Sequence, residues 1–261
     1  MTLLTWGVPV KTMSIPTILV TRPSPAGEQL VNRLRTLGLM AYHAPLVNLS
    51  PGNDLTRLPV LLQAMQPGDL VFVLSQNAIR YIHPLLNRNK LSWPAKLTYY
   101  AIGRSTALAL QAVSHLPVNY PLNVSTSEGL LALPELQRVN GKQALLLRGN
   151  GGRALLGETL IIRGAKVSYC ECYQRNPVYY DAHKQSAYWQ HARINTLVVT
   201  SGEMLQQLYT LIPAYYRSFW LLHCRMIVVS ERLAAYANRL GWHDVRVAEG
   251  ADNDALIREL Q

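Results

Sequence analysis

The stretch TILVTRPSPAGEQLVNRLRTLG, residues 17–38, has the pattern that decides the fold of this chain. A short aliphatic run comes first, small polar residues follow, and an amphipathic segment ends the unit. Leu30, Leu34 and Leu37 recur at helical spacing in that last segment, and Gly38 is the predicted C-cap. This order predicts a β-strand, a polar turn and an α-helix.

Five further segments repeat the order. Their aliphatic runs lie at residues 69–74, 98–102, 143–147, 196–199 and 226–229, and the turns that follow read SQNA, GRST, RGNGGR, TSGE and SERL. Unbroken aliphatic strands alternating with helices are typical of parallel sheets covered on both faces. The sequence therefore predicts an α/β fold of doubly wound, flavodoxin-like sheets, in which turns at the carboxyl ends of strands and the helix starts beside them bind anions.

Two extended segments interrupt the series, at residues 42–54 and 166–180. They predict two α/β domains joined by two extended crossings, a division that suits a length of 261 residues. The discontinuous domain comprises residues 13–45 and 174–261, and the inserted domain comprises residues 50–168. Residues 1–12 lack the basic region and cleavage site of a secretory signal, so we expect a non-functional extension there.

Positive charge is in excess although charged residues are few. Only 15% of residues are charged, 49% are hydrophobic, and the formal net charge is +10. The apolar content argues against extended disorder, and the charge predicts an anionic partner. No block of five or more Lys and Arg marks a nucleic-acid tail or a membrane anchor; the arginines stand singly, often beside Gly, Ser or Thr. This favours discrete pockets for small anions.

Metal and thiol chemistry find little support in the sequence. Three cysteines, at 170, 172 and 224, suit neither a disulfide framework nor a zinc site, and seven histidines show no metal-ligand spacing. The run at 251–255 is predicted to be the N-cap of the last helix rather than a calcium loop. No apolar run approaches the ~18 residues of a membrane span. We expect a cytoplasmic protein without a metal or cofactor.

Three features are candidates for the site, each with a plainer alternative. RGNGGR, residues 148–153, lacks the Gly-Lys-Ser/Thr ending of a P-loop, so it is a candidate anion-contacting turn or an ordinary tight turn. The hydroxyls of GRST and TSGE are expected to cap helices. Tyr173 is placed to donate a proton or hydrogen bond, or is a partly buried structural tyrosine.

An ordered series of motifs resembles a known family. ILVTRP, LSQNA, AIGRSTALAL, LLLRGNGGR, ECYQR, VVTSGEMLQQL and DNDAL, found in this order over residues 13–261, resemble bacterial uroporphyrinogen-III synthase. The resemblance implies a lyase of tetrapyrrole (heme and siroheme) synthesis that needs no cofactor. It would cyclise hydroxymethylbilane, a linear octacarboxylate, to uroporphyrinogen III, with inversion of ring D and loss of water.

The resemblance also implies the residues of the site. Tyr173 is the implied catalytic residue, assisting departure of the hydroxyl. Arg22, Arg104, Arg148 and Arg153 are our expected counterions for carboxylates. The implied substrate-binding residues are Thr21, Arg22 and Pro23; Ser75, Gln76 and Asn77; Gly103, Arg104, Ser105 and Thr106; Arg148, Gly149, Asn150, Gly151, Gly152 and Arg153; Thr200, Ser201 and Gly202; and Ser230.

The expected partner is thus a small molecule, with no nucleic acid and no membrane. We expect a monomer that receives its substrate by transient hand-over from hydroxymethylbilane synthase. Two alternatives stay open at this point: a two-lobed small-anion binding protein without catalysis, and an RNA-binding protein, which only the isoelectric point of about 9.7 suggests.

Overall fold

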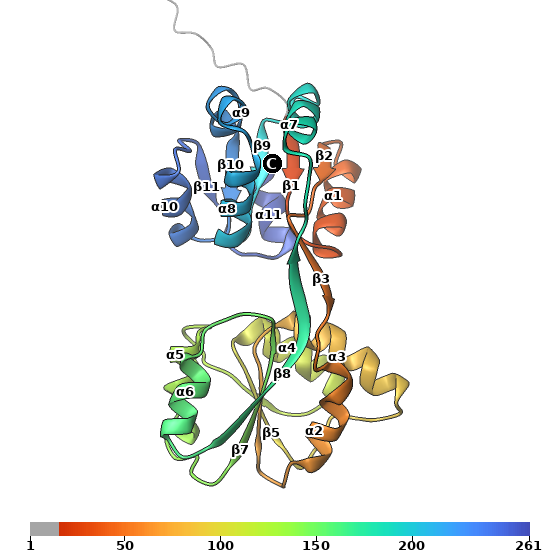
Figure 1. Cartoon of the computed structure of the whole chain (residues 1–261), viewed down its shortest axis with the longest axis vertical. Helices are drawn as coiled ribbons and strands as arrows, with labels where there is room; N and C mark the ends of the chain where they lie inside the picture. Colours follow the sequence, from red (N-terminus) through yellow and green to blue (C-terminus); the bar gives the residue numbers. More distant parts are fainter. Residues whose placement is uncertain (1–15) are drawn as a thin grey trace, which may run out of the picture. The chain divides into compact units, whose positions relative to one another are not determined.

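The structure is a computed structural model that describes residues 16–261, so the expected extension at residues 1–12 lies outside the described residues. The described chain divides into two units. The first contains the chain up to Asn48 and from Pro177 to Gln261, and the second contains Leu49–Asn176. Each unit has its own sheet and its own core (Figure 1).

The first unit is built on a parallel sheet with the spatial order β11-β10-β9-β1-β2. Its strands are β1 (Thr17–Val20), β2 (Met40–His43), β9 (Thr196–Val198), β10 (Arg225–Val228) and β11 (Val245–Val247). Counted in chain order, these strands stand 2-1-3-4-5, the order of flavodoxin. The direction of the connections reverses between β1 and β9, which makes this the switch point of the sheet.

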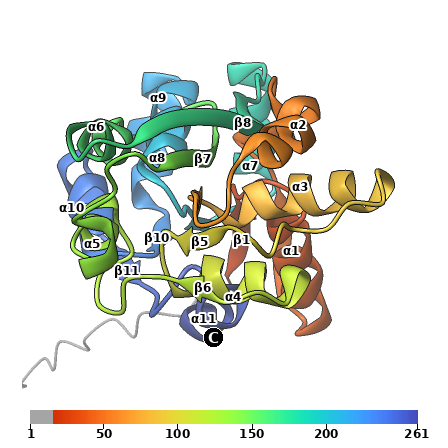
Figure 2. The same ribbon diagram turned by 90° about the horizontal axis from the view of Figure 1, so that it is seen from below.

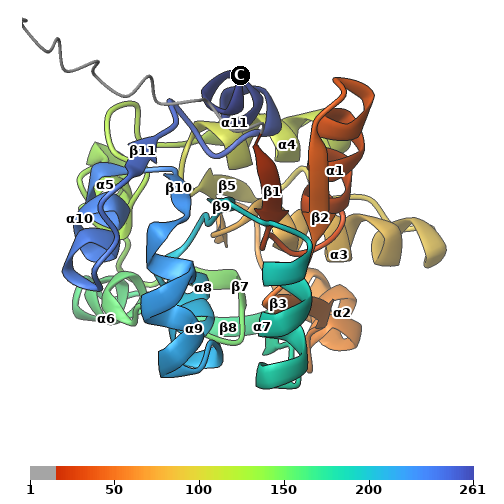
Figure 3. The same cartoon turned by 90° about the horizontal axis from the view of Figure 1, so that it is seen from above.

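Helices cover both faces of this sheet. They are α1 (Ala26–Thr36), α7 (Ala182–His191), α8 (Gly202–Leu211), α9 (Ala214–Phe219), α10 (Glu231–Arg239) and α11 (Asn253–Leu260), with the 3-10 turn η3 (Leu221–His223). Helices α1 and α11 pack on the buried side chains of Ile18 and Val20. Figure 3 shows α7 and α8 on the opposite face.

The end of α1 differs in part from the prediction. Gly38 has the left-handed φ of +81° that ends a helix, as expected. Leu37, however, does not join Leu30 and Leu34 in the core: α1 ends at Thr36, and Leu37 is 50% exposed. The chain has already left the helical path at Leu37, so helical spacing no longer directs this side chain inward.

The second unit has a six-stranded sheet with the spatial order β3-β8-β7-β4-β5-β6. Its strands are β3 (Val47–Pro51), β4 (Leu70–Val73), β5 (Thr98–Ala101), β6 (Val118–Asn119), β7 (Gln143–Gly149) and β8 (Lys166–Pro177). The five strands from β8 to β6 pair in parallel. Here the connections change direction between β4 and β7.

Helices cover both faces of this second sheet as well. They are α2 (Leu58–Ala64), α3 (Gln76–Arg88), α4 (Arg104–Ser114), α5 (Ser127–Leu131) and α6 (Leu155–Ile162), with the 3-10 turns η1 (Leu55–Arg57) and η2 (Pro134–Leu136). Val71 and Val73 face the cluster that includes α2, α3 and α4, whereas Leu70 and Phe72 face α5 and α6 (Figure 2). Burial on both faces explains why the strands are aliphatic without alternation, and the doubly wound α/β prediction is confirmed.

Three strands were absent from the six predicted units: β2, β6 and β11. Each is at most four residues long and lies at the edge of its sheet. MAYH, VN and VRV mix polar and apolar residues, because an edge strand need not be buried on both faces. Among residues 16–261, no helix is both long and apolar enough to cross a membrane.

Candidate active site

The carboxyl edge of the second sheet brings together most of the residues that the sequence singled out. The turns after β4 and β5 include Ser75 and Gly103, and neighbouring strands hold them beside the end of β7. Strand β7 runs to Gly149, two residues beyond the predicted strand, because Arg148 and Gly149 still pair with β8; the turn itself therefore starts at Asn150. The amide of Leu74 donates to the carbonyl of Leu147 (3.1 Å), and the amide of Ile102 donates to that of Val73 (3.1 Å). Because ligands of doubly wound sheets bind at this edge, near the switch point, these turns form a candidate site.

Tyr173 lies beside the glycine-rich turn. In the pairing of β7 with β8, Gly149 stands opposite Tyr173. A Cβ added at Gly149 would lie 2.7 Å from Cζ of the Tyr173 ring, so only glycine leaves room for the phenol. Tyr81 stacks on Tyr173 with the ring centroids 6.3 Å apart and the planes 8° from parallel. Tyr173 is 6% exposed, and its ring is therefore held in one place at the edge of the sheet.

The glycines of RGNGGR serve different purposes. Gly149 makes room for Tyr173, whereas Gly152 has a φ of +108°, which an L side chain adopts only with strain. Nothing lies within 4 Å of a Cβ placed at Gly151. The amide of Asn150 donates to the carbonyl of Tyr173 (3.1 Å), which ties the turn to β8. The turn thus leaves its backbone exposed while its first glycine fits the tyrosine.

The two arginines of RGNGGR, Arg148 at the end of β7 and Arg153 after the turn, already have partners. Arg148 folds back on the turn: Nε donates to the carbonyl of Gly149 (3.3 Å), and the guanidinium lies over the Tyr169 ring, 5.3 Å from its centroid. Arg153 makes a two-pronged ion pair with Glu128 at the start of α5. Hydrogen bonds from Arg153 lower the pKa of Glu128 to about 2, so the pair is fully ionised at neutral pH. A substrate carboxylate would compete with Glu128 for Arg153.

The start of α4 corrects the prediction that hydroxyls of GRST cap this helix. The N-cap is Gly103, without a side-chain hydrogen bond, and Ser105 and Thr106 lie inside the first turn. A Cβ at Gly103 would overlap the hydroxyl oxygen of Ser125, so the cap position admits only glycine. Arg104 and Ser105 are exposed and Thr106 is buried. The first amides of α4 therefore lack a side-chain acceptor, which suits a helix start that binds an anion.

Three other serines of the predicted set cap helices, and for Ser201 of TSGE this confirms the expectation. The hydroxyl oxygens of Ser75, Ser201 and Ser230 accept hydrogen bonds from the amides of Asn77 (3.1 Å), Met204 (3.2 Å) and Leu233 (3.3 Å). These bonds start α3, α8 and α10 at the carboxyl edges of the sheets. Gln76 and Gly202 are the first residues of α3 and α8.

At the switch point of the first unit, the turn after β1 lies next to the turn after β9. Both the amide and the hydroxyl of Thr21 donate to the carbonyl of Val198 (3.2 and 2.8 Å), so this threonine joins the two strands. Arg22 Nη1 donates to Oδ1 of Asn253 (2.6 Å). Burial lowers the pKa of Arg22, and the nearby carboxylate of Asp252 opposes that shift. Arg22 is thus a partly desolvated cation at this edge.

The remaining predicted residues of the first unit lie close by. Pro23 accepts a hydrogen bond from the amide of Gly27 (3.0 Å) in the entry to α1, and the Thr200 hydroxyl lies 3.8 Å from Sδ of Met204. These contacts shape the two turns around the switch point.

Thiol and metal chemistry find no support in the described part of the chain. Cys170, Cys172 and Cys224 are free and buried, and burial raises the pKa of Cys224 to about 12. The hydrogen bond with Cys170 and burial raise the pKa of Cys172 as well. Within residues 16–261, no three His, Cys, Asp or Glu side chains are grouped so as to hold a metal ion.

Comparison with known proteins decides the family. The model of the family described as "Uroporphyrinogen-III synthase HemD" matches residues 28–258. The chain belongs to the uroporphyrinogen-III synthase family. Proteins named uroporphyrinogen-III synthase from Escherichia coli and Salmonella typhimurium are each 56% identical over 244 residues, which cover 94% of this chain and 99% of each relative. These relatives give no support to a non-catalytic binding protein.

Solved structures of uroporphyrinogen-III synthases share the fold. A mutant of the enzyme from Thermus thermophilus matches with a TM-score of 0.64 at 17% identity, covering 93% of this chain and 97% of that one. The enzyme from Helicobacter pylori matches with a TM-score of 0.55 at 16% identity, covering 94% and 100%. At such low identity, the likeness concerns the fold alone.

The sequence did not reveal three residues that contact predicted site residues: Glu128, Asn253 and Tyr81. Glu128 was not singled out, because it precedes Arg153 by 25 positions and only the folded chain brings them together. Asn253 was expected only within a helix N-cap, whereas its side chain also holds Arg22. Tyr81, which stacks on Tyr173, looks in the sequence like any aromatic residue of an amphipathic helix.

Proposed function

We propose that this chain cyclises hydroxymethylbilane to uroporphyrinogen III with inversion of ring D, and that this reaction makes it a lyase. The observation that carries the proposal is the 56% identity to uroporphyrinogen-III synthases over 94% of the chain. The polar turns at the carboxyl edges of both sheets agree with it. A substrate with eight carboxylates requires many anion contacts, and helix starts and arginines provide them.

We propose that two kinds of group in the second unit have different roles, one binding the substrate carboxylates and the other transferring a proton. The uncapped first turn of α4, with Gly103 and Arg104, binds carboxylates through its amides and one cation. The exposed glycines Gly151 and Gly152 add backbone amides, and Arg153 adds a second cation. Tyr173 acts on the reacting centre. Its phenol protonates the departing hydroxyl, which leaves as water and generates a cationic azafulvene on the substrate.

Ring D then attacks the azafulvene through a substituted carbon. The resulting spiro intermediate fragments and recloses, and the proton lost in restoring the pyrrole returns to the Tyr173 phenolate. The net change is loss of one water. Because the free bilane closes spontaneously to the uninverted type I isomer, the enzyme's main task is to hold the chain in the geometry for inversion.

The test supplies freshly generated hydroxymethylbilane to the purified chain, oxidises the products and separates the isomers. We expect the type III fraction to rise with enzyme concentration until it exceeds the type I fraction. Type I product alone at every enzyme concentration would overturn the proposal.

The ion pair between Arg153 and Glu128 gives a prediction about the KM for substrate, because a substrate carboxylate would take the place of Glu128. Arg153→Ala should raise KM severalfold with kcat nearly unchanged, because a carboxylate contact made equally in ground and transition states is lost. Glu128→Gln should lower KM at low salt, since Arg153 is then free of its internal partner, and added salt should reduce the gain. Steady-state kinetics at two salt concentrations measure both effects.

Arg138→Ala is the matched control, because it removes an exposed arginine of the same unit. KM should stay close to that of the unchanged chain. A fall in kcat without a rise in KM for Arg153→Ala would contradict the counterion role.

Finally, we propose that the chain works as a monomer in the cytoplasm and takes its substrate from hydroxymethylbilane synthase by transient hand-over. Free thiols and the unstable substrate support this setting. Analytical ultracentrifugation, alone and with the synthase, tests the oligomeric state and the hand-over.

A further inference from the structure

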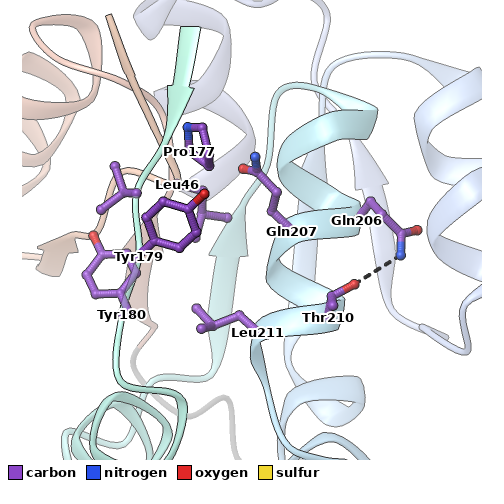
Figure 4. A pocket seen from close by; sticks show the side chains of 9 residues that line it. Leu46, Pro177, Tyr179, Tyr180, Gln206, Gln207, Thr210 and Leu211 are labelled. Atoms are coloured by element: carbon purple, nitrogen blue, oxygen red, sulfur yellow. Dashed lines mark hydrogen bonds between the residues drawn. The ribbon is translucent and has the colours of Figure 1, made fainter.

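A cavity of about 330 Å³ lies in the first unit, between α8 and the segment that follows β8 (Figure 4). None of its lining residues carries a charge. They are Leu46, Pro177, Val178, Tyr179 and Tyr180 on one side, and Gln206, Gln207, Thr210 and Leu211 of α8 on the other. The volume is near the lower limit for small-molecule sites, which suits one substituted ring rather than a whole tetrapyrrole.

One polar atom in this cavity has no partner. Oε1 of Gln207 is buried and accepts no hydrogen bond from residues 16–261. In its neighbour Gln206, both ends of the side-chain amide have a partner: Nε2 donates to the Thr210 hydroxyl (3.1 Å), and Oε1 accepts from the Tyr236 hydroxyl. Burial of an acceptor without a hydrogen bond costs free energy, so a ligand that donates a hydrogen bond to Gln207 Oε1 would be stabilised.

The other walls offer aromatic and aliphatic surface. Figure 4 shows Tyr179 and Gln207 facing each other across the cavity, with Leu46 and Leu211 also lining it. Tyr179 is 89% exposed, so its ring is free to take up a partner. Tyr180 is fixed, because its hydroxyl donates to the carbonyl of Pro45 (3.0 Å). The cavity thus combines a hydrogen-bond acceptor with an unoccupied aromatic ring.

The cavity lies next to the carboxyl edge of the first sheet. The amide of Leu46 donates to the carbonyl of Thr21 (3.2 Å), the first residue of the predicted substrate turn. Helix α8, which supplies Gln207, begins at the same edge with the N-cap Ser201. A molecule bound at these turns would therefore lie beside the cavity, within the same unit.

We infer that this cavity binds one pyrrole ring of the tetrapyrrole, whose N–H donates to Oε1 of Gln207 while its face packs on Tyr179. The inference rests on the proposed function. A pyrrole is flat, uncharged and a hydrogen-bond donor without an acceptor nitrogen, which matches the unpartnered Oε1 of Gln207 in a cavity that also has an aromatic ring and aliphatic side chains. The acetate and propionate arms stay at the rim in water, because no cation lines the cavity to offset their desolvation.

Binding of single pyrroles tests the inference directly. The probes are porphobilinogen, a monopyrrole with acetate and propionate arms, and its N-methyl derivative, which lacks the N–H. We expect porphobilinogen to shift the side-chain amide resonances of Gln207 in a ¹H–¹⁵N spectrum. The N-methyl derivative should bind about tenfold more weakly, the factor that corresponds to ~1.4 kcal/mol. Equal affinities, or unshifted Gln207 resonances, would overturn the inference.

Variants separate the hydrogen bond from the bulk of the methyl group. In Gln207→Leu, the preference for porphobilinogen over its N-methyl derivative should disappear, whereas Tyr179→Ala should weaken both probes equally. Gln29→Leu, an exposed glutamine of α1, is the matched control and should keep the tenfold preference. A preference retained in Gln207→Leu would also overturn the inference.

The isomer assay on the same preparations keeps the two proposals apart. If the chain forms type III product but shows no preference for porphobilinogen over its N-methyl derivative, the inference about the cavity is refuted and the proposed reaction is supported. Failure to form type III would refute the reaction itself, whatever the probes do.

Discussion

Tyr173→Phe is expected to reduce the rate of type III formation by about a hundredfold, because a positioned general acid typically contributes ~10²–10⁴ to such steps. The ring of Tyr173 is clamped between Gly149 and Tyr81, so phenylalanine can keep the same position and only the hydroxyl is lost. The measurement is the initial rate of type III formation by isomer separation, with spontaneous type I formation as the internal reference.

Tyr81→Phe is the matched control, since it removes a hydroxyl from the stacked neighbour and keeps both rings. Its rate should remain within about twofold of the unchanged chain. An unaffected rate in Tyr173→Phe, or an equal loss in both variants, would remove the Tyr173 hydroxyl from the mechanism.

Asp69→Ala is expected to lower the free energy of unfolding of the second unit by about 2–4 kcal/mol. Asp69 is 5% exposed and immediately precedes β4. Its Oδ2 accepts from the amide of Gln66 (2.7 Å), and its Oδ1 accepts from the amide of Gln143 at the start of β7 (3.0 Å). Alanine would leave both amides without these acceptors and would remove the side-chain link between the starts of the two central strands, which would remain joined only by their backbone pairing.

Urea unfolding measures the loss, and hydrogen exchange of peptides from β7 locates it. We expect faster exchange at residues 143–149 and unchanged exchange at β1 and β9 in the first unit. Glu158→Ala, an exposed acidic residue of α6, should change the free energy of unfolding by less than about 0.5 kcal/mol. A stability of Asp69→Ala equal to that of this control would contradict the structural role.

Tyr173 and Asp69 differ in how visible their roles are in the sequence. Tyr173 belongs to a motif that resembles a family, so the sequence alone predicts its importance. Asp69 looks like an ordinary polar residue at the start of an aliphatic run. Its partner Gln143 lies 74 positions away, and only the pairing of β4 with β7 brings the two together.

The sequence by itself determined the local elements. Aliphatic runs buried on both faces made the six main strands recognisable, and serines before amphipathic segments marked helix starts, because both signals depend on neighbours within a few residues. The capping rule was wrong at the start of α4. It predicted a hydroxyl cap from GRST, whereas the N-cap is Gly103, because the distant side chain of Ser125 leaves no room for a Cβ there.

Only the tertiary structure decided how these elements combine into a site. Strand order places the turns after β4, β5 and β7 in one row with Tyr173, pairs Arg153 with Glu128 and leaves Gln207 facing a cavity. Such neighbours are separated by tens of residues along the chain. Their contacts arise from sheet pairing and helix packing, which no short stretch of sequence specifies.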